Sequence, residues 1–136
     1  MFPYTVVTRE RTVRKGQATS VTAMTDSGEV TILEGHISLL GSLRSGMVTI
    51  KTTDGEEFFA VSTGFLEVRP SGEVILLADT AEHADELDET IIKKAQEEAV
   101  RVMTEKRHID EEAYAHAAAA LERELAREKV FRRKRH

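Results

Sequence analysis

Apolar and polar residues alternate over short runs in the first part of the chain, whereas apolar residues recur every three or four positions in the last part. Alternation predicts half-buried strands, and short strands about eight to twelve residues apart are typical of a β-sandwich or barrel. The predicted strands are Tyr4–Thr8, Gln17–Met24, Gly28–Leu33, Met47–Thr52, Glu57–Ser62, Phe65–Arg69 and Glu73–Ala78. Asp54-Gly55 predicts a tight hairpin between two of them, and Gly64 predicts a bulge or a sharp corner.

Two helical stripes follow the strands. The first consists of Leu87, Ile91, Ala95, Ala99, Val102 and Met103, and the second of Ala113, Ala117, Leu121 and Leu125. Asp110 stands between them as an N-cap for the second helix, which predicts an antiparallel helical hairpin. Its seam is rich in alanine, which buries little apolar area. The hairpin is therefore either marginal and able to swing away, or an ordinary small-residue interface.

Composition divides the chain at the same place. All 8 glycines and both prolines lie at or before position 72, and alanine rises from 3 residues before position 73 to 12 after it. We therefore expect an α+β fold, with a β-sandwich at 1–83 and an α-helical hairpin at 84–136. The chain of 136 residues carries a net charge of −5 and ends in a strongly basic segment.

The residue inventory excludes several kinds of chemistry. The chain has no cysteine, which rules out disulfides, cysteine-ligated zinc, iron–sulfur clusters and a thiol nucleophile. Its five histidines are scattered, and it has no phosphate-binding glycine loop and no Gly-x-Ser-x-Gly motif. It also has neither a signal-peptide layout nor an apolar run long enough to cross a bilayer. We expect a non-catalytic chain without a cofactor, soluble or held at a membrane only through a partner.

Three collinear blocks give the chain a family resemblance. Residues Gly28–Leu40 with Leu43–Val48, then Asp54–Val68, then Val74–Glu82 resemble the epsilon subunit of bacterial F-type ATP synthase. The departures from the family pattern are Glu34, Ser38 and Ser45 in place of prolines, and Thr31 and Thr63 in place of glycines. The resemblance implies a sandwich of about ten short strands followed by a two-helix domain.

The family's partners follow from this resemblance as expectations. Such subunits bind the gamma subunit and the c-ring in the central rotor, and couple ion flow to ATP synthesis without performing chemistry. On the matched loop, Glu29 is expected at the c-ring, and His36 and Leu40 near gamma. The alternatives are a turn carboxylate for Glu29, a loop-ordering hydrogen bond for His36 and a core position for Leu40. The expected location is peripheral, on the cytoplasmic face of the plasma membrane.

The helical domain of this family also restrains ATP hydrolysis by setting basic residues against an acidic segment of the beta subunit. The residues expected to form this positive face are Arg123, Arg127, Arg132, Arg133, Lys134 and Arg135. The alternatives for this basic end are a solvated helix terminus and a nucleic-acid-binding tail, and we expect no nucleic-acid partner because an isolated basic run without interleaved aromatic residues, such as 132–135, is a weak nucleic-acid signal.

Some family members bind ATP on the hairpin through an Ile/Leu-Asp-x-x-Arg-Ala motif. Ile109 and Asp110 match its start, but Ala113 and Tyr114 stand where the motif has Arg and Ala, so no arginine is present to clamp a phosphate. We therefore expect weak or no ATP binding at Ile109 and Asp110. A nucleotide-sensing hairpin remains the alternative function.

Overall fold

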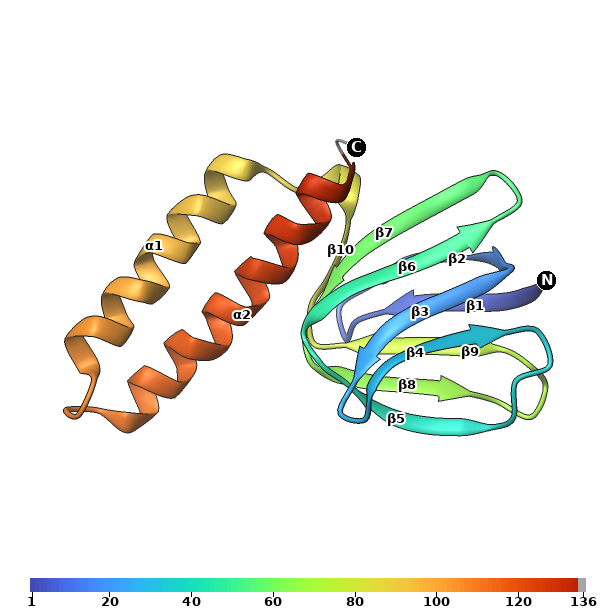
Figure 1. Ribbon diagram of the computed structural model, residues 1–136, viewed down its shortest axis with the longest axis horizontal. Helices are drawn as coiled ribbons and strands as arrows, with labels where there is room; N and C mark the ends of the chain where they lie inside the picture. Colours follow the sequence, from blue (N-terminus) through green and yellow to red (C-terminus); the bar gives the residue numbers. More distant parts are fainter. Residues whose placement is uncertain (135–136) are drawn as a thin grey trace.

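The computed structural model describes residues 1–134 and shows ten strands followed by a short 3₁₀ helix and two long α-helices (Figure 1). The strands are β1 (Phe2–Val7), β2 (Thr12–Ala18), β3 (Ser20–Thr25), β4 (Gly28–Leu33), β5 (Leu39–Leu43), β6 (Gly46–Thr52), β7 (Gly55–Val61), β8 (Gly64–Val68), β9 (Val74–Ala78) and β10 (Ala81–His83). The helices are η1 (Ala84–Glu86), α1 (Glu89–Lys106) and α2 (Glu111–Lys134). This confirms the α+β fold class.

The strands form two layers of a sandwich. One layer has the order β10-β7-β6-β3-β4 and the other the order β5-β8-β9-β1-β2, and a single residue pair, Thr25 with Leu43, joins β3 to β5. All pairings are antiparallel except that of β1 with β9. The inner side chains are aliphatic or aromatic and almost wholly buried, among them Val6, Ile50 and Leu66 at 0% exposure. This apolar core between the layers fixes the position of both outer faces.

Most predicted strands match the structure closely. Gly28–Leu33 is strand β4 with the same bounds, and Asp54-Gly55 turns β6 into β7 as an antiparallel hairpin. Gly64 begins β8 at a close approach to β9, where a Cβ atom would lie 2.0 Å from the Leu77 carbonyl oxygen. The predicted tight corner at Gly64 is thus confirmed as a place where no side chain fits.

Three strands were not predicted correctly. The predicted strand Gln17–Met24 covers parts of two strands, the end of β2 and most of β3. They are separate because Thr19, between them, belongs to neither strand. Strand β5 was missed since it contains Gly41 and Ser42, and β10 has only three residues. Both are formed by pairing with distant strands, β5 with β8 and β10 with β7, which no local pattern shows.

The helices form an antiparallel hairpin in which α2 lies between α1 and the sandwich (Figure 1). The predicted stripes are wrong in phase at two positions: Ile91 is 66% and Leu125 is 49% exposed. Their neighbours Ile92, Ala126 and Val130 are buried instead. Because α2 packs against both α1 and the sandwich, its buried positions do not follow one stripe, and in α1 the buried position is Ile92, one residue on from the predicted Ile91. Neither helix within residues 1–134 has the length and hydropathy to span a bilayer.

The hairpin buries small side chains, as its composition predicts. Its buried apolar residues in α1 are Ile92 and Ala99, and in α2 they are Ala117, Ala126 and Val130. Against the sandwich, Val130 joins Ala60 and Ala84 in a small apolar cluster separate from the main core. We call this contact, with the half-buried Met47, Phe58 and Leu87 around it, the covered face.

Candidate protein-binding surface

The outer side of the β5-β8-β9-β1 layer carries large apolar side chains exposed to solvent. Phe65 on β8 and Leu77 on β9 face each other in register and are 54% and 40% exposed. One row further along the strands, Leu40 is 72% exposed and Ile75 is half-buried. We call the surface of Leu40, Phe65, Ile75 and Leu77 the open face. Exposed apolar side chains gathered on one face mark a surface for contact with another protein.

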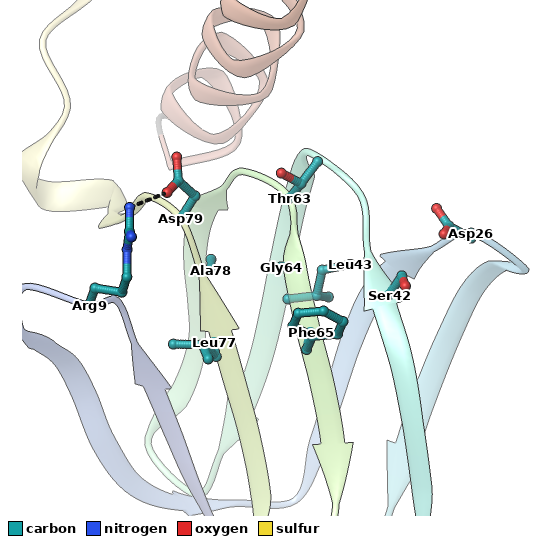
Figure 2. A pocket seen from close by; sticks show the side chains of 10 residues that line it. All are labelled: Arg9, Asp26, Ser42, Leu43, Thr63, Gly64, Phe65, Leu77, Ala78 and Asp79. Carbon is teal, nitrogen blue, oxygen red and sulfur yellow. Dashed lines mark ion pairs between the residues drawn. The ribbon is translucent and has the colours of Figure 1, made fainter.

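A groove of about 520 Å³ lies at the end of the open face where β8 begins (Figure 2). Figure 2 shows Phe65 and Leu77 side by side on neighbouring strands, with Arg9 and Asp79 joined by an ion pair at one side. That pair spans 3.5 Å and is exposed, so it contributes little to stability. The groove is lined by Arg9, Asp26, Ser42, Leu43, Thr63, Gly64, Phe65, Leu77, Ala78 and Asp79. Its apolar floor and charged rim match the anatomy of a protein interface.

The three residues expected at the c-ring and gamma lie in different places. Glu29 is exposed on β4 opposite Met24, beside the β3–β4 turn, and lines a groove that also contains Glu122 and Leu125 of α2. His36 lies in the loop after the other end of β4, where its Nδ1 is 2.7 Å from the Ile37 carbonyl oxygen. Whether these residues touch a rotor partner stays a prediction, although the structure separates Glu29 from His36 by the length of β4.

Leu40 lies at the edge of the open face. It pairs with Glu67 of β8 and is strongly exposed. The alternative that Leu40 is a core residue is therefore wrong. Its exposure keeps the expected contact with gamma as a prediction.

The basic residues of α2 do not form one free positive face. Arg127 pairs with Glu82 of β10, at the contact between α2 and the sandwich, and with Glu124 of its own helix. Arg123 lies 3.9 Å from Glu124, and Arg132 lies 3.6 Å from Glu128. The hairpin in this position therefore engages the basic residues internally.

The basic residues in the last turn of α2 also contact side chains outside the helix. The guanidinium of Arg133 lies 5.6 Å from the centre of the Phe58 ring, a cation–π distance. The Lys134 ammonium lies 3.0 Å from Asp85 and lowers the pKa of that carboxyl through a hydrogen bond and its charge. Arg135 lies outside the described residues.

Ile109 and Asp110 lie in the loop between the helices. Ile109 is 77% exposed. Asp110 accepts a hydrogen bond from the Ala113 amide at 3.0 Å, which confirms it as the N-cap of α2. Their proposed part in weak nucleotide binding is not tested by this geometry. Within residues 1–134, no group of three or more His, Asp or Glu side chains is arranged to hold a metal ion.

The sandwich, the hairpin docked on one of its faces and the apolar groove on the other define a two-part α+β module with one face free for contacts. The family described as "ATP synthase, Delta/Epsilon chain, beta-sandwich domain" matches residues 1–84. The ATP synthase epsilon chains of Stenotrophomonas maltophilia and Xylella fastidiosa are 41% and 42% identical to this chain over 99 residues. The aligned residues are 72% of this chain and 70% of each of those chains. The chain belongs to the ATP synthase epsilon chain family.

A solved structure agrees on the fold. A chain in the Euglena gracilis mitochondrial ATP synthase, determined as an OSCP/F1/c-ring assembly, superposes with a TM-score of 0.80 at 24% identity. The alignment covers 95% of this chain and 80% of that one. At this identity the likeness concerns the fold alone.

Sequence reasoning missed the residues that dominate the open face. Phe65 and Leu77 were assigned to strands, but alternation does not tell which outer face another element covers. Glu82 was likewise unnoticed as a partner of Arg127, 45 positions away along the chain. The available signal was that Phe65 and Leu77 are large apolar residues at positions facing away from the core.

Proposed function

We propose that this chain is a non-catalytic subunit of the central stalk of an F-type ATP synthase, where it helps couple ion flow through the c-ring to ATP synthesis. The observation that carries the proposal is the open face, because within residues 1–134 Leu40, Phe65 and Leu77 are exposed there while the opposite face is covered by α2. Family membership supplies the partners, and the solved relatives come from ATP synthase assemblies that include a c-ring or central stalk.

In this proposal, the open face binds the gamma subunit. Phe65 and Leu77 supply buried apolar area in the complex, and Leu40 and His36 extend the contact along the sandwich. Glu29, at the far end of β4, is assigned to the c-ring. The chain then sits peripherally at the cytoplasmic face of the plasma membrane, held there by gamma and the c-ring.

The hairpin is proposed to restrain ATP hydrolysis when it leaves the sandwich and extends. Arg123, Arg127, Arg132, Arg133, Lys134 and Arg135 then face an acidic segment of the beta subunit. Exposed ion pairs contribute about 0–1 kcal/mol each, so several must act together and salt must weaken the restraint. The small buried area of the hairpin supports such a movement.

Binding to gamma and the c-ring is tested by co-purification with full-length variants. Phe65→Ser is expected to weaken binding about tenfold or more, since it removes an aromatic anchor from the middle of the open face. Ile91→Ser is the matched control, because Ile91 is an exposed large apolar residue too, at 66% against 54% for Phe65, but lies on α1. If both variants bind like the original chain, the open face is not the binding surface.

The restraint on hydrolysis is tested in the reconstituted enzyme. Removing residues 90–136 is expected to raise the ATP hydrolysis rate and to leave assembly intact. A full-length variant with glutamine at Arg132, Arg133 and Lys134 is expected to raise it in part. Unchanged hydrolysis in the truncated enzyme would exclude an inhibitory hairpin.

A further inference from the structure

We propose that Glu82, Glu124 and Arg127 form a latch that keeps α2 docked on the sandwich and withholds Arg127 from acidic partners. The holding role concerns this chain alone. The withholding role rests on the proposed function, because it supposes that an acidic segment of a partner competes for Arg127. We call these three residues the Arg127 latch.

The latch joins the two parts of the molecule through one guanidinium. Arg127 Nη2 pairs with Oε1 of Glu82 on β10, and Arg127 Nη1 pairs with Oε2 of Glu124 one helical turn away. The side chains are 19%, 21% and 5% exposed, respectively. The Lys134–Asp85 pair also joins the two parts, but its side chains are 42% and 69% exposed. Solvent therefore screens that pair far more than it screens the latch.

Burial makes the three charges depend on one another. A carboxylate as buried as that of Glu124 is unfavourable unless a cation and hydrogen bonds compensate it. Oε2 of Glu82 is buried and has no hydrogen-bond partner within residues 1–134, so Glu82 relies on its other oxygen, which Arg127 binds. Without Arg127 both carboxylates lose this guanidinium, and without Glu82 the docked Arg127 keeps only Glu124, a partner that it also has when α2 is released because both lie on that helix.

The apolar contact beside the latch is too small to dominate docking. Val130, Ala60 and Ala84 are its fully buried members, and two of the three are alanines. Because this contact offers little area, the charge balance of the latch weighs heavily in the choice between docked and released α2. In the docked position, both terminal nitrogens of Arg127 are committed to internal carboxylates. Docking and binding of Arg127 to an acidic partner therefore exclude each other.

The test measures the docked and released populations of the isolated full-length chain. The chain has no cysteine, so spin labels at Thr53→Cys on the sandwich and Ala119→Cys on α2 report the distance by pulsed electron resonance without interfering thiols. Glu82→Gln is expected to raise the ratio of released to docked molecules roughly tenfold, because it removes the carboxylate that pairs with Arg127 only in the docked position. Glu122→Gln is the matched control, since it removes the same charge from an exposed site on α2 and is expected to leave the ratio unchanged.

A compensated variant separates release from misfolding. Glu82→Met, Glu124→Leu and Arg127→Met together remove all three charges, and buried ion clusters replaced by apolar residues commonly keep their stability. We expect this triple variant to be docked again. A latch is excluded if Glu82→Gln leaves the distances unchanged, if Glu122→Gln releases α2 equally, or if the triple variant is as released as Glu82→Gln.

Hydrolysis by the reconstituted enzyme distinguishes the latch from the function on which its second role rests. If Glu82→Gln releases α2 and the enzyme hydrolyses ATP more slowly, both are supported. If α2 is released but hydrolysis is unchanged, the latch stands and the inhibitory function fails. If the distances are unchanged, the latch fails whatever the hydrolysis rate.

Discussion

The two outer faces of the sandwich both carry large apolar side chains, but α2 packs over those of only one face. On the covered face, Met47 and Phe58 are half-buried because Val130 of α2 packs beside them. On the open face, Phe65 and Leu77 occupy comparable outward positions and remain largely exposed. The same kind of side chain is thus structural on one face and available on the other.

This difference shows how one sandwich serves two purposes. The covered face uses a small apolar cluster and the Arg127 latch to hold an element of its own chain. On the open face, Phe65 remains 54% exposed among residues 1–134, so its area is available for contact with another protein. Substitutions on the covered face should therefore change the hairpin, and substitutions on the open face should change binding.

The largest expected effect tests the close pairing of β8 and β9, the strands that carry Phe65 and Leu77 of the open face. Gly64→Ala would place a Cβ atom 2.0 Å from the Leu77 carbonyl oxygen and 2.7 Å from the Ala78 Cα atom, so β8 and β9 must separate. We expect a loss of about 4 kcal/mol or more in the free energy of unfolding, measured in urea. Gly41→Ala on β5 is the control, because no atom lies within 4 Å of its added Cβ. Equal stability of the two variants would contradict a close backbone approach at Gly64.

The next effect separates the two faces directly. Val130→Ala removes a fully buried side chain from the covered face and should cost roughly 1–3 kcal/mol of docking free energy. Leu77→Ala on the open face should change the stability of the isolated chain by less than about 0.5 kcal/mol. Hydrogen exchange along α2 measures the first effect and thermal unfolding the second. Faster exchange in α2 of Leu77→Ala would break the distinction between the faces.

The sequence predicted the layers better than the contacts between them. Strand positions such as Gly28–Leu33 follow from local alternation and turn residues, and Asp110 follows from capping chemistry. These signals are local, so one sequence suffices. The pattern predicted seven strands, and only the resemblance to a family implied about ten, the number that the structure reaches with β5 and β10 included.

The contacts could not be predicted because they join distant segments. Nothing near Arg127 in the sequence indicates Glu82, and nothing near Phe65 indicates that α2 packs on the opposite layer. Ile91 and Ile92 are adjacent and chemically identical, so the pattern alone gave the wrong one of the two as buried. Helix phase at such positions depends on the neighbouring element, which for α1 is chiefly α2.

A third prediction concerns the core that both faces share. Burial, and then the hydrogen bond to Glu57, raises the pKa of Tyr4 to about 12 from 10.0. Tyr4 favours the folded state below pH 10, where its hydroxyl is protonated in both states, and this contribution falls as the pH rises toward 12. Relative to Tyr4→Phe, the free energy of unfolding should therefore fall by roughly 1–2 kcal/mol over this interval. Parallel pH profiles for the two chains would contradict this burial of the hydroxyl.

The smallest effect concerns the free end of the hairpin, which neither face touches. Asp110→Ala removes the oxygen that accepts the Ala113 amide and should cost about 1 kcal/mol in the first turn of α2. Faster hydrogen exchange is expected at Ala113 but not at Val130, which is held by the covered face, and Asp110→Asn should keep most of the protection because its side chain retains an acceptor. Calorimetric titration with ATP is expected to show weak or no binding by either variant or by the original chain, because Asp110 caps the helix and no arginine follows it in the motif. Micromolar affinity that disappears in Asp110→Ala would instead make this end of the hairpin a nucleotide site.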